Sequence, residues 1–341
     1  MKKRIIDLRE STPLLDIVSY GRGGKSLTPA QKEHIARTVR RVPEVVVKVS
    51  GGARTVAGVR QHMDYVGREG KLGLEADTGE HLDGKGFERQ LTEDWDLDLE
   101  AHERQTERSI RGRKPPKLVH NLIFSMPFGT PPDKVLQAVR KLALNEWQWK
   151  HRFAMVLHTD GEGEQPHVHV VLKAMSEQGQ RLNIKRATLR AWRQQFAANL
   201  RELGVAANAT ERAVRGATKT HRSDGAYRAE KRKDWTIAQD RERRILREWS
   251  QGAVGWGKGE AKLERTRQEV ANGWRGVSGR LKADGDTELG RSVDLFLAQM
   301  PSAKTERRSI LFSMLNKIDN SDTRIIPAPE AKDLRHQEKS R

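Results

Sequence analysis

Short apolar, β-branched runs alternate with stretches whose apolar residues recur at helical spacing over roughly the first 205 residues. The runs predict strands at residues 44–50, 118–125, 152–158 and 166–174. The helical stretches predict helices at residues 54–67, 133–149 and 186–203. This order is typical of the α+β class. We therefore expect a central antiparallel sheet with helices on one side, followed by a mostly helical, basic C-terminal region.

Composition suggests the boundaries of four parts. Residues 1–43 are a basic N-terminal arm, in which Thr28 and Pro29 begin a short capped helix. Residues 44–207 contain the predicted sheet, together with a charged insert at about 73–117 that the pattern does not assign. The other two parts are a basic helical region at 208–325 and a disordered tail at 326–341.

The C-terminal region has helical stretches near residues 236–250, 260–274, 286–299 and 303–318. Most of them carry charge on several faces. They are either solvated, loosely packed helices or a basic arm that binds DNA or a partner, and the sequence leaves both interpretations open.

The charge balance favours a polyanionic ligand. Lys and Arg number 64 against 46 Asp and Glu, a formal net charge of +18, which indicates nucleic acid first and an anionic membrane surface second. No run approaches the ~18 apolar residues of a membrane span, and the N-terminus lacks the features of a signal peptide. The chain has no cysteine, so a metal would be held by histidines and carboxylates.

Three histidines suggest a metal site. His167 and His169 are separated by one residue in a predicted strand, so both imidazoles leave the same face. His158 ends the preceding strand, and antiparallel pairing would bring it to the same place. Three imidazoles with open positions are typical of a catalytic metal centre, and Asp160 would orient one ring. The alternative is that all three are half-buried polar residues.

Tyr65 is one of three tyrosines, and it lies off the apolar stripe of its predicted helix. A phenol, with a pKa near 10, attacks a phosphate only where a metal or cationic neighbours favour its anion. Tyr20 is the weaker candidate nucleophile because no predicted element holds it. His62, one turn before Tyr65, either touches the same site or is a surface histidine, and the second interpretation is favoured.

Basic residues near these motifs are candidates for contacts with a DNA backbone: Arg54, Arg68, Lys71, Lys185 and Arg186. Each of them alone is also typical of a solvated surface. Several phosphate contacts would make binding fall steeply with salt. Trp147 and Trp149 are weaker candidates for stacking on bases.

Three segments together resemble the relaxases of the VirD2-like and MobA-type class, the His-hydrophobe-His (HUH) single-strand endonucleases. They are VRQHMDYVGREGKLGLE, VHNLIFSMPFGTPPDKV, and HTDGEGEQPHVHVVLKA with its continuation RLNIKRATLRAWRQQFAANLRELGV and ATERAVRG. They cover roughly residues 44–216. The resemblance rests on order, spacing and three separate motifs, whereas HVH alone would be weak.

The resemblance implies that Tyr65 becomes linked to the 5′ phosphate of the nicked strand and that His158, His167 and His169 bind a divalent metal, with Mg²⁺ or Mn²⁺ expected. It implies that Asp160 is the supporting acidic residue and that Ser125 contacts DNA near the scissile phosphate. The loop between His158 and His167 is longer than the family's compact form, so Asp160 in place of His158 is an alternative ligand.

The function implied by the resemblance is site- and strand-specific nicking and rejoining of DNA at an origin of transfer, for conjugation or plasmid mobilisation. The alternatives are a rolling-circle replication initiator or transposase with the same chemistry, and a non-catalytic DNA-binding protein. No GxxxxGK[ST] loop is present to indicate a helicase. The expected partners are single-stranded or locally melted DNA, an accessory DNA-binding protein and a type IV secretion coupling protein. The expected location is the bacterial cytoplasm, with export to a recipient cell as a further expectation.

Overall fold

The computed structural model describes residues 26–97, 99, 115–159, 165–217, 236–251, 258–302, 307–308 and 310–314. The chain divides into two compact units. Among the described residues, the first unit contains those of Gly24–Glu211 and Leu281–Phe296, and the second contains those of Arg212–Arg280 and Leu297–Arg341. Tyr20, Asp160 and the tail at 326–341 lie outside the described residues.

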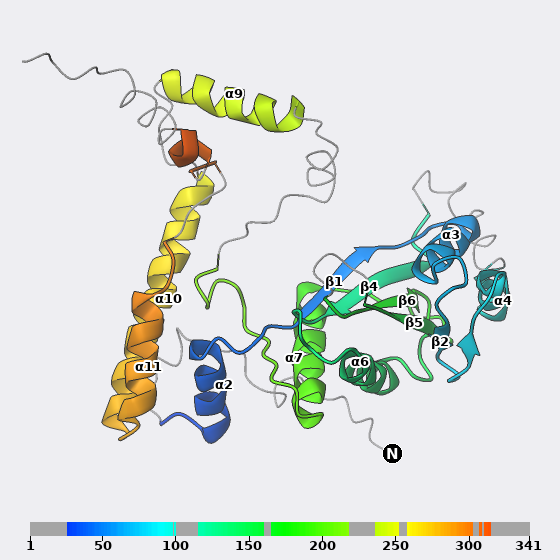
Figure 1. Ribbon diagram of the computed structural model, residues 1–341, viewed down its shortest axis with the longest axis horizontal. Helices are drawn as coiled ribbons and strands as arrows, with labels where there is room; N and C mark the ends of the chain where they lie inside the picture. The colour runs from blue at the N-terminus through cyan, green and yellow to red at the C-terminus, as the bar shows by residue number, and fades with distance from the viewer. Residues whose placement is uncertain are drawn as a thin grey trace, which may run out of the picture. The chain divides into compact units, whose positions relative to one another are not determined.

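The first unit is built around a six-stranded sheet in the order β1-β4-β6-β5-β2-β3, in which every neighbouring pair is antiparallel (Figure 1). The strands are β1 (Val46–Gly51), β2 (Leu74–Ala76), β3 (His81–Leu82), β4 (Val119–Ser125), β5 (Phe153–His158) and β6 (His167–Lys173). The predicted α+β class with a central antiparallel sheet is confirmed. The two histidine-bearing strands, β5 and β6, are neighbours in its middle.

Helices α6 (Pro132–Glu146) and α7 (Arg186–Glu202) cover one face of the sheet (Figure 1). Alternate residues of β6 point into this core because side chains alternate along a strand; they are Val168, Val170 and Leu172. Phe124 packs edge-on against Trp147 and Phe196 in the same core. This layer corresponds to the helices that the sequence predicts on one side.

The opposite face also carries helices, over part of its area. Helices α3 (Val56–Val66) and α4 (Phe87–Asp94) form a second apolar cluster there with Ala154 and Val156 of β5 and Val171 of β6. The elements β2, β3 and α4 come from the charged insert that the sequence pattern did not assign. The insert therefore contributes core residues as well as surface charge, including the fully buried Trp95.

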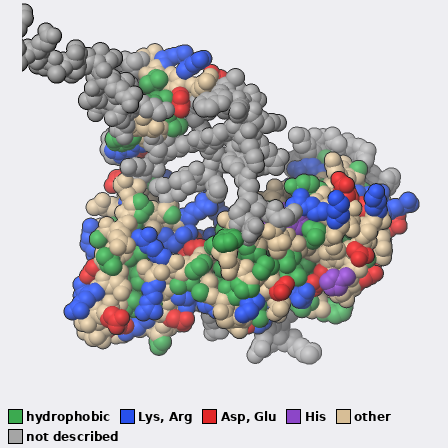
Figure 2. Space-filling model, in the orientation of Figure 1, with side chains coloured by type: hydrophobic (Ala, Val, Ile, Leu, Met, Phe, Trp, Pro, Cys, Tyr) green, Lys and Arg blue, Asp and Glu red, His purple; other side chains and the backbone are tan. Residues whose placement is uncertain are grey.

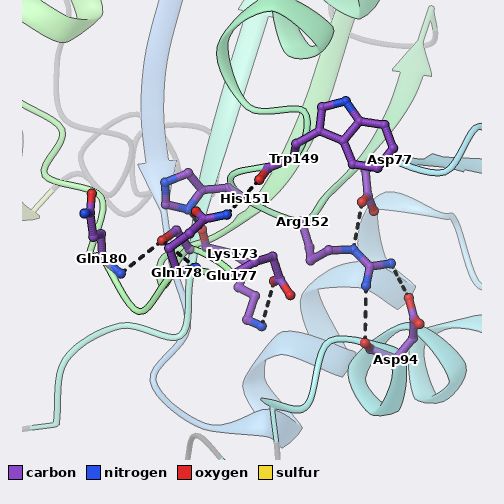
Figure 3. Close-up of polar contacts among 10 residues, drawn as sticks. Asp77, Asp94, Trp149, His151, Arg152, Lys173, Glu177, Gln178 and Gln180 are labelled. Atoms are coloured by element: carbon purple, nitrogen blue, oxygen red, sulfur yellow. Dashed lines mark hydrogen bonds and ion pairs between the residues drawn. The ribbon is translucent and has the colours of Figure 1, made fainter. Parts of the chain in front are cut away.

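Arg152 ties the insert to the central strands (Figure 3). Its Nε donates to Asp77 at 2.7 Å, and its Nη2 pairs with Asp94 at the end of α4. At the same edge of the sheet, Gln178 donates to the carbonyl of Trp149 at 3.0 Å. These contacts lie beside the start of β5, at the opposite end of that strand from His158.

The described part of the N-terminal arm is the helix α2 (Pro29–Val39), which begins where the sequence predicts. The hydroxyl of Thr28 accepts from the backbone N–H of Gln31 in a capping box. Within the first unit, the ring of His34 lies 3.2 Å from the hydroxyl of Thr210, so α2 packs against the chain that follows α7. Lys32 forms an ion pair with Asp286 at 3.4 Å, just before α11 (Thr287–Ala298).

The C-terminal region is helical, as predicted. It contains α9 (Thr236–Ser250) and α10 (Lys258–Ala283). In the second unit, the indole N–H of Trp274 donates to the carbonyl of Val214 at 2.9 Å, and Trp274 is fully buried. In the part of the chain that the structure describes, no helix combines the length and apolar character needed to cross a membrane.

The turn after α3 depends on left-handed backbone. Arg68, Glu69 and Gly70 have φ values of 53°, 57° and 79°, and a Cβ on Gly70 would overlap the backbone of Gly84. Gly79, with φ 84°, is the matched control because nothing lies within 4 Å of its Cβ position.

We expect Gly79→Ala to lower stability by about 1–2 kcal/mol, the strain of a left-handed L-residue. Gly70→Ala should lower it by more, because the two backbone segments must also separate. Denaturant unfolding of both variants measures the difference, and equal effects would show that the Gly70–Gly84 contact is not tight in solution.

Candidate metal centre and nucleophile

The three predicted histidines meet at one end of the central strands β5 and β6. Strand pairing places Ser125, His167 and His158 side by side across β4, β6 and β5. His169 lies two residues along β6 on the same face. One nitrogen from each histidine lies within 4.8 Å of the other two, so the three side chains are close enough to hold one metal ion.

Backbone carbonyls set the orientation of two rings. Nε2 of His158 lies 2.6 Å from the carbonyl of Val66, and Nδ1 of His167 lies 2.9 Å from the carbonyl of Gln165. A carbonyl only accepts, so both of these nitrogens carry the proton in the neutral rings. The lone pairs are then on Nδ1 of His158 and Nε2 of His167. This is the outer-shell arrangement that orients ligating imidazoles.

His169 is suited to act as a neutral ligand. Its Nδ1 is buried without a hydrogen-bond partner among the described residues, so a metal would find an unsatisfied nitrogen here. Burial first, and then the charges of His158, His167, His62 and Arg68, lower the pKa of His169 to about 3. A metal ligand must be unprotonated, and the lowered pKa leaves this imidazole neutral at pH 7.

A lowered pKa does not by itself mark the site. Burial first, and then Lys117 and Arg181, lower the pKa of His120 to about 4, although His120 lies near the other end of β4. The convergence of three imidazole nitrogens distinguishes the cluster, and His120 has no part in it.

Tyr65 is delivered to the cluster by the last turn of α3. Val59, Met63 and Val66 of this helix are buried, whereas Tyr65 is 59% exposed, as expected for a residue off the apolar stripe. It directly precedes Val66, whose carbonyl accepts from His158. The phenol is therefore exposed to solvent, on the residue next to the one whose carbonyl contacts His158.

His62 is closer to the site than the favoured sequence interpretation suggested. Its ring stacks on that of Tyr65 with centroids 6.3 Å apart and planes 26° apart. Its Nε2 is buried and has no hydrogen-bond partner among the described residues, and burial lowers its pKa. Its charge also acts on His169. His62 is thus a half-buried neighbour of the cluster and not a plain surface histidine.

Arg68 links the phenol to the histidines. Its guanidinium carbon lies 5.8 Å from the centre of the Tyr65 ring, and its Nη2 lies 3.5 Å from Nδ1 of His158. The left-handed backbone at Arg68 and Glu69 turns the chain back at the end of α3. Non-glycine residues with positive φ concentrate at functional sites.

The other candidate DNA contacts differ in their distance from the cluster. Ser125 is paired directly with His167, and Lys71 is exposed in the turn that contains Arg68. Arg54 lies before the first residue of α3, and that helix of 11 residues is about 16 Å long. It is therefore remote from the end that touches His158.

Lys185 and Arg186 also lie away from the cluster. They lie at the start of α7. Before α7, β6 runs to the opposite end of the sheet. The chain turns back there, where the N–H of Leu182 donates to the carbonyl of Ala174. Figure 2 shows basic side chains spread over the visible face with acidic ones between them, so charge alone does not locate a site.

Sequence reasoning missed the two carbonyls that orient the histidines. It assigned an orienting role to Asp160, which lies outside the described residues. The carbonyls belong to Val66 and Gln165, and a backbone group leaves no signal in the residue type. The stacking of His62 could have been suspected from its spacing of three residues from Tyr65 on one helix.

Comparison with known proteins agrees with this geometry. Residues 65–205 match the family model for the relaxase MobA/VirD2-like nuclease domain. No curated protein and no solved structure matches the chain. The matched segment begins at Tyr65 and includes Arg68, Ser125 and the three clustered histidines. Residues 65–205 of the chain are therefore similar to the nuclease domain of the MobA/VirD2-like relaxases.

Proposed function

We propose that this protein is a relaxase that nicks and rejoins one DNA strand at an origin of transfer, through a covalent 5′-phosphotyrosine intermediate. One observation carries the proposal: Tyr65 is exposed at the end of α3, beside the Val66 carbonyl that holds His158 in a cluster of three imidazoles. This observation supports a nucleophile and a metal centre at one end of the segment that matches the relaxase nuclease model.

His158, His167 and His169 would hold the divalent ion, with Mg²⁺ or Mn²⁺ as the expected species. When bound, such an ion polarises a phosphate oxygen and neutralises charge in the transition state. The residues present fit an ion because one nitrogen of each lies within 4.8 Å of the other two and the buried Nδ1 of His169 has no hydrogen-bond partner in the described structure. Asp160 remains a candidate for an additional or alternative ligand.

Tyr65 would supply the attacking oxygen. Its phenol loses a proton, the oxygen forms a bond to phosphorus, and the bond from phosphorus to the 3′ oxygen of the preceding nucleotide breaks, leaving a free 3′ hydroxyl after protonation. One phosphate ester replaces another, so the reverse attack by a 3′ hydroxyl rejoins DNA without ATP.

Arg68 would favour both the phenolate and the pentavalent phosphate. Its guanidinium lies near the phenol ring and the His158 nitrogen, so a phosphate placed between them would meet a fixed positive charge. Charges positioned before reaction require little rearrangement as negative charge develops. Ser125, in the row of His167, would contact the strand beside the scissile phosphate.

The biological setting is part of the proposal. We place the protein in the bacterial cytoplasm, acting on single-stranded or locally melted DNA in plasmid mobilisation or conjugation. An accessory DNA-binding protein and a secretion coupling protein are the proposed partners. The basic residues of the chain support a polyanionic substrate, with a formal net charge of +18.

The nucleophile is tested with Tyr65→Phe. Wild-type protein, incubated with Mn²⁺ and a labelled single-stranded oligonucleotide from the origin of its own replicon, should give a covalent adduct on a denaturing gel. Tyr65→Phe should give none, because the attacking oxygen is removed, while DNA affinity stays within a few-fold. Trp149→Phe, a change at an exposed aromatic residue at the other end of β5, should retain the adduct. An adduct with Tyr65→Phe would show that another residue is the nucleophile.

The metal centre is tested by calorimetric titration with Mn²⁺. We expect His167→Ala to weaken Mn²⁺ binding by at least about 10-fold, since changes merely to groups that orient ligands have effects of that size. His81→Ala removes an exposed histidine of β3 and should leave the affinity unchanged. His158→Ala separates the two ligand sets, because unaltered Mn²⁺ affinity in that variant would favour Asp160 over His158. Unaltered affinity in His167→Ala would contradict the proposed centre.

The role of Arg68 is tested with Arg68→Gln, using Lys71→Gln as a charge-matched control in the same turn. Loss of one preorganised cation should slow nicking by about 10²- to 10³-fold. Affinity for the oligonucleotide should change only a few-fold, since Arg68 is one of several phosphate contacts. Single-turnover nicking and anisotropy titrations measure the two effects. Equal, small changes in both variants would reduce Arg68 to a general surface charge.

A further inference from the structure

An exposed phenylalanine stands on the loop that leaves the sheet beside the histidine cluster. Phe128 is 69% exposed, in a loop whose first residue, Met126, is buried in the core. An aromatic side chain with this exposure contributes little apolar burial to the fold. Single exposed apolar residues are common on protein surfaces, so its position and rigidity must decide whether it has a role.

A hydrogen-bonded turn presents Phe128 at the tip of this loop. Thr130 donates to the carbonyl of Pro127 through its backbone N–H at 3.4 Å and its hydroxyl at 2.9 Å. Gly129 has φ 83°, so the four residues form a turn with left-handed backbone at the third position, as in a type II turn. Phe128 occupies the second position, where a side chain projects outward. A ring held this way loses little entropy on binding a ligand.

The loop begins directly after the residue of β4 that pairs with His167. Ser125 is the last residue of β4 and pairs with His167, and the next N–H, of Met126, donates to the carbonyl of Pro166 at 3.2 Å. Phe128 follows Met126 by two residues, so its Cα lies within about 7 Å of the Cα of Met126. The loop that bears Phe128 therefore starts at the end of the sheet where the proposed metal ligands lie.

The other exposed aromatic residues of this unit have different surroundings. Tyr65 is the proposed nucleophile. Trp149 is 84% exposed but lies at the opposite end of β5, where its carbonyl accepts from Gln178 (Figure 3). Trp147, the other tryptophan considered for stacking, is 2% exposed and packs in the core. Apart from Tyr65, Phe128 is the exposed Phe, Tyr or Trp among the described residues of this unit whose loop starts beside the cluster.

We infer that Phe128 is a stacking platform for a base of the single-stranded DNA that crosses the site, close to the scissile phosphate. The inference rests on the proposed function, because that function supplies the single strand. A base presents an apolar face that a preorganised aromatic ring can cover, whatever its sequence. The platform would fix the strand on one side of the phosphate while Tyr65 approaches from α3.

The experiment measures binding of labelled oligothymidylate to the full chain at low salt, in a Tyr65→Phe background that cannot cleave. We expect Phe128→Ala to weaken affinity by about 5- to 150-fold, the range for one base stacked on an aromatic side chain. Phe128→Trp and Phe128→Tyr should restore it, whereas Phe128→Leu, apolar but not aromatic, should not. Trp149→Ala is the matched control and should leave affinity unchanged.

A second oligomer isolates the stacking. An abasic oligomer of the same length keeps the phosphates and removes the base faces, so the ratio of affinities between parent and Phe128→Ala should fall to about one on it. Thermal unfolding of each variant shows whether the fold is intact, which we expect because the side chain is exposed.

Three outcomes would overturn the inference: Phe128→Ala binding oligothymidylate within twofold of the parent, Phe128→Leu binding as well as the parent, or no binding by the parent itself. These outcomes are distinct from failure of the proposed function. If wild type forms the tyrosine adduct and Phe128→Ala binds oligothymidylate normally, the proposed relaxase function is retained and the stacking role of Phe128 is rejected. If the stacking effect is present and no adduct forms, the platform remains in a protein that binds single strands without cutting them.

Discussion

The hydrogen bond between Nε2 of His158 and the carbonyl of Val66, 2.6 Å long, joins the two halves of the site. It orients the ring of a buried histidine, whose other nitrogen lies 3.5 Å from Nη2 of Arg68. It also anchors the last turn of α3, which includes Tyr65, at the end of β5. Together with the apolar contacts of α3 on β5 and β6, this contact holds the element that bears the proposed nucleophile against the strands that bear the proposed metal ligands.

The sheet can hold this site because its two faces have different surroundings. One face packs on α6 and α7 and contains the large apolar core, including Phe124 and Val168. The other face is covered over β5 and β2 by α3 and α4, while Lys48 of β1, on the side of the sheet that bears the histidines, is exposed. Alternation along β6 therefore places valines in the core on one face and histidines on the other face, which is partly accessible.

The charged insert supports α3, because residues of the insert form part of the surface against which α3 packs. Phe87 and Leu91 of α4 pack with the buried stripe of α3, and Arg152 holds Asp77 and Asp94 of the insert against β5. The turn between α3 and β2 then carries Arg68 in left-handed backbone next to both Tyr65 and His158. The position of the phenol thus depends on a segment whose residues take no part in the proposed chemistry.

The sequence by itself determined the α+β class, the four long strands, the capped start of α2 and the pairing of His167 with His169 on one face, because each follows from a local period or a cap. It also singled out Tyr65 by its place off the apolar stripe. Only the tertiary structure decided the rest. The short strands β2 and β3 have too few residues to show a period, the orienting groups of the histidines are backbone carbonyls, and the burial of His62 and the exposure of Phe128 depend on neighbours distant in the chain. Local patterns record which face a side chain takes, whereas contacts between remote segments decide what that face meets.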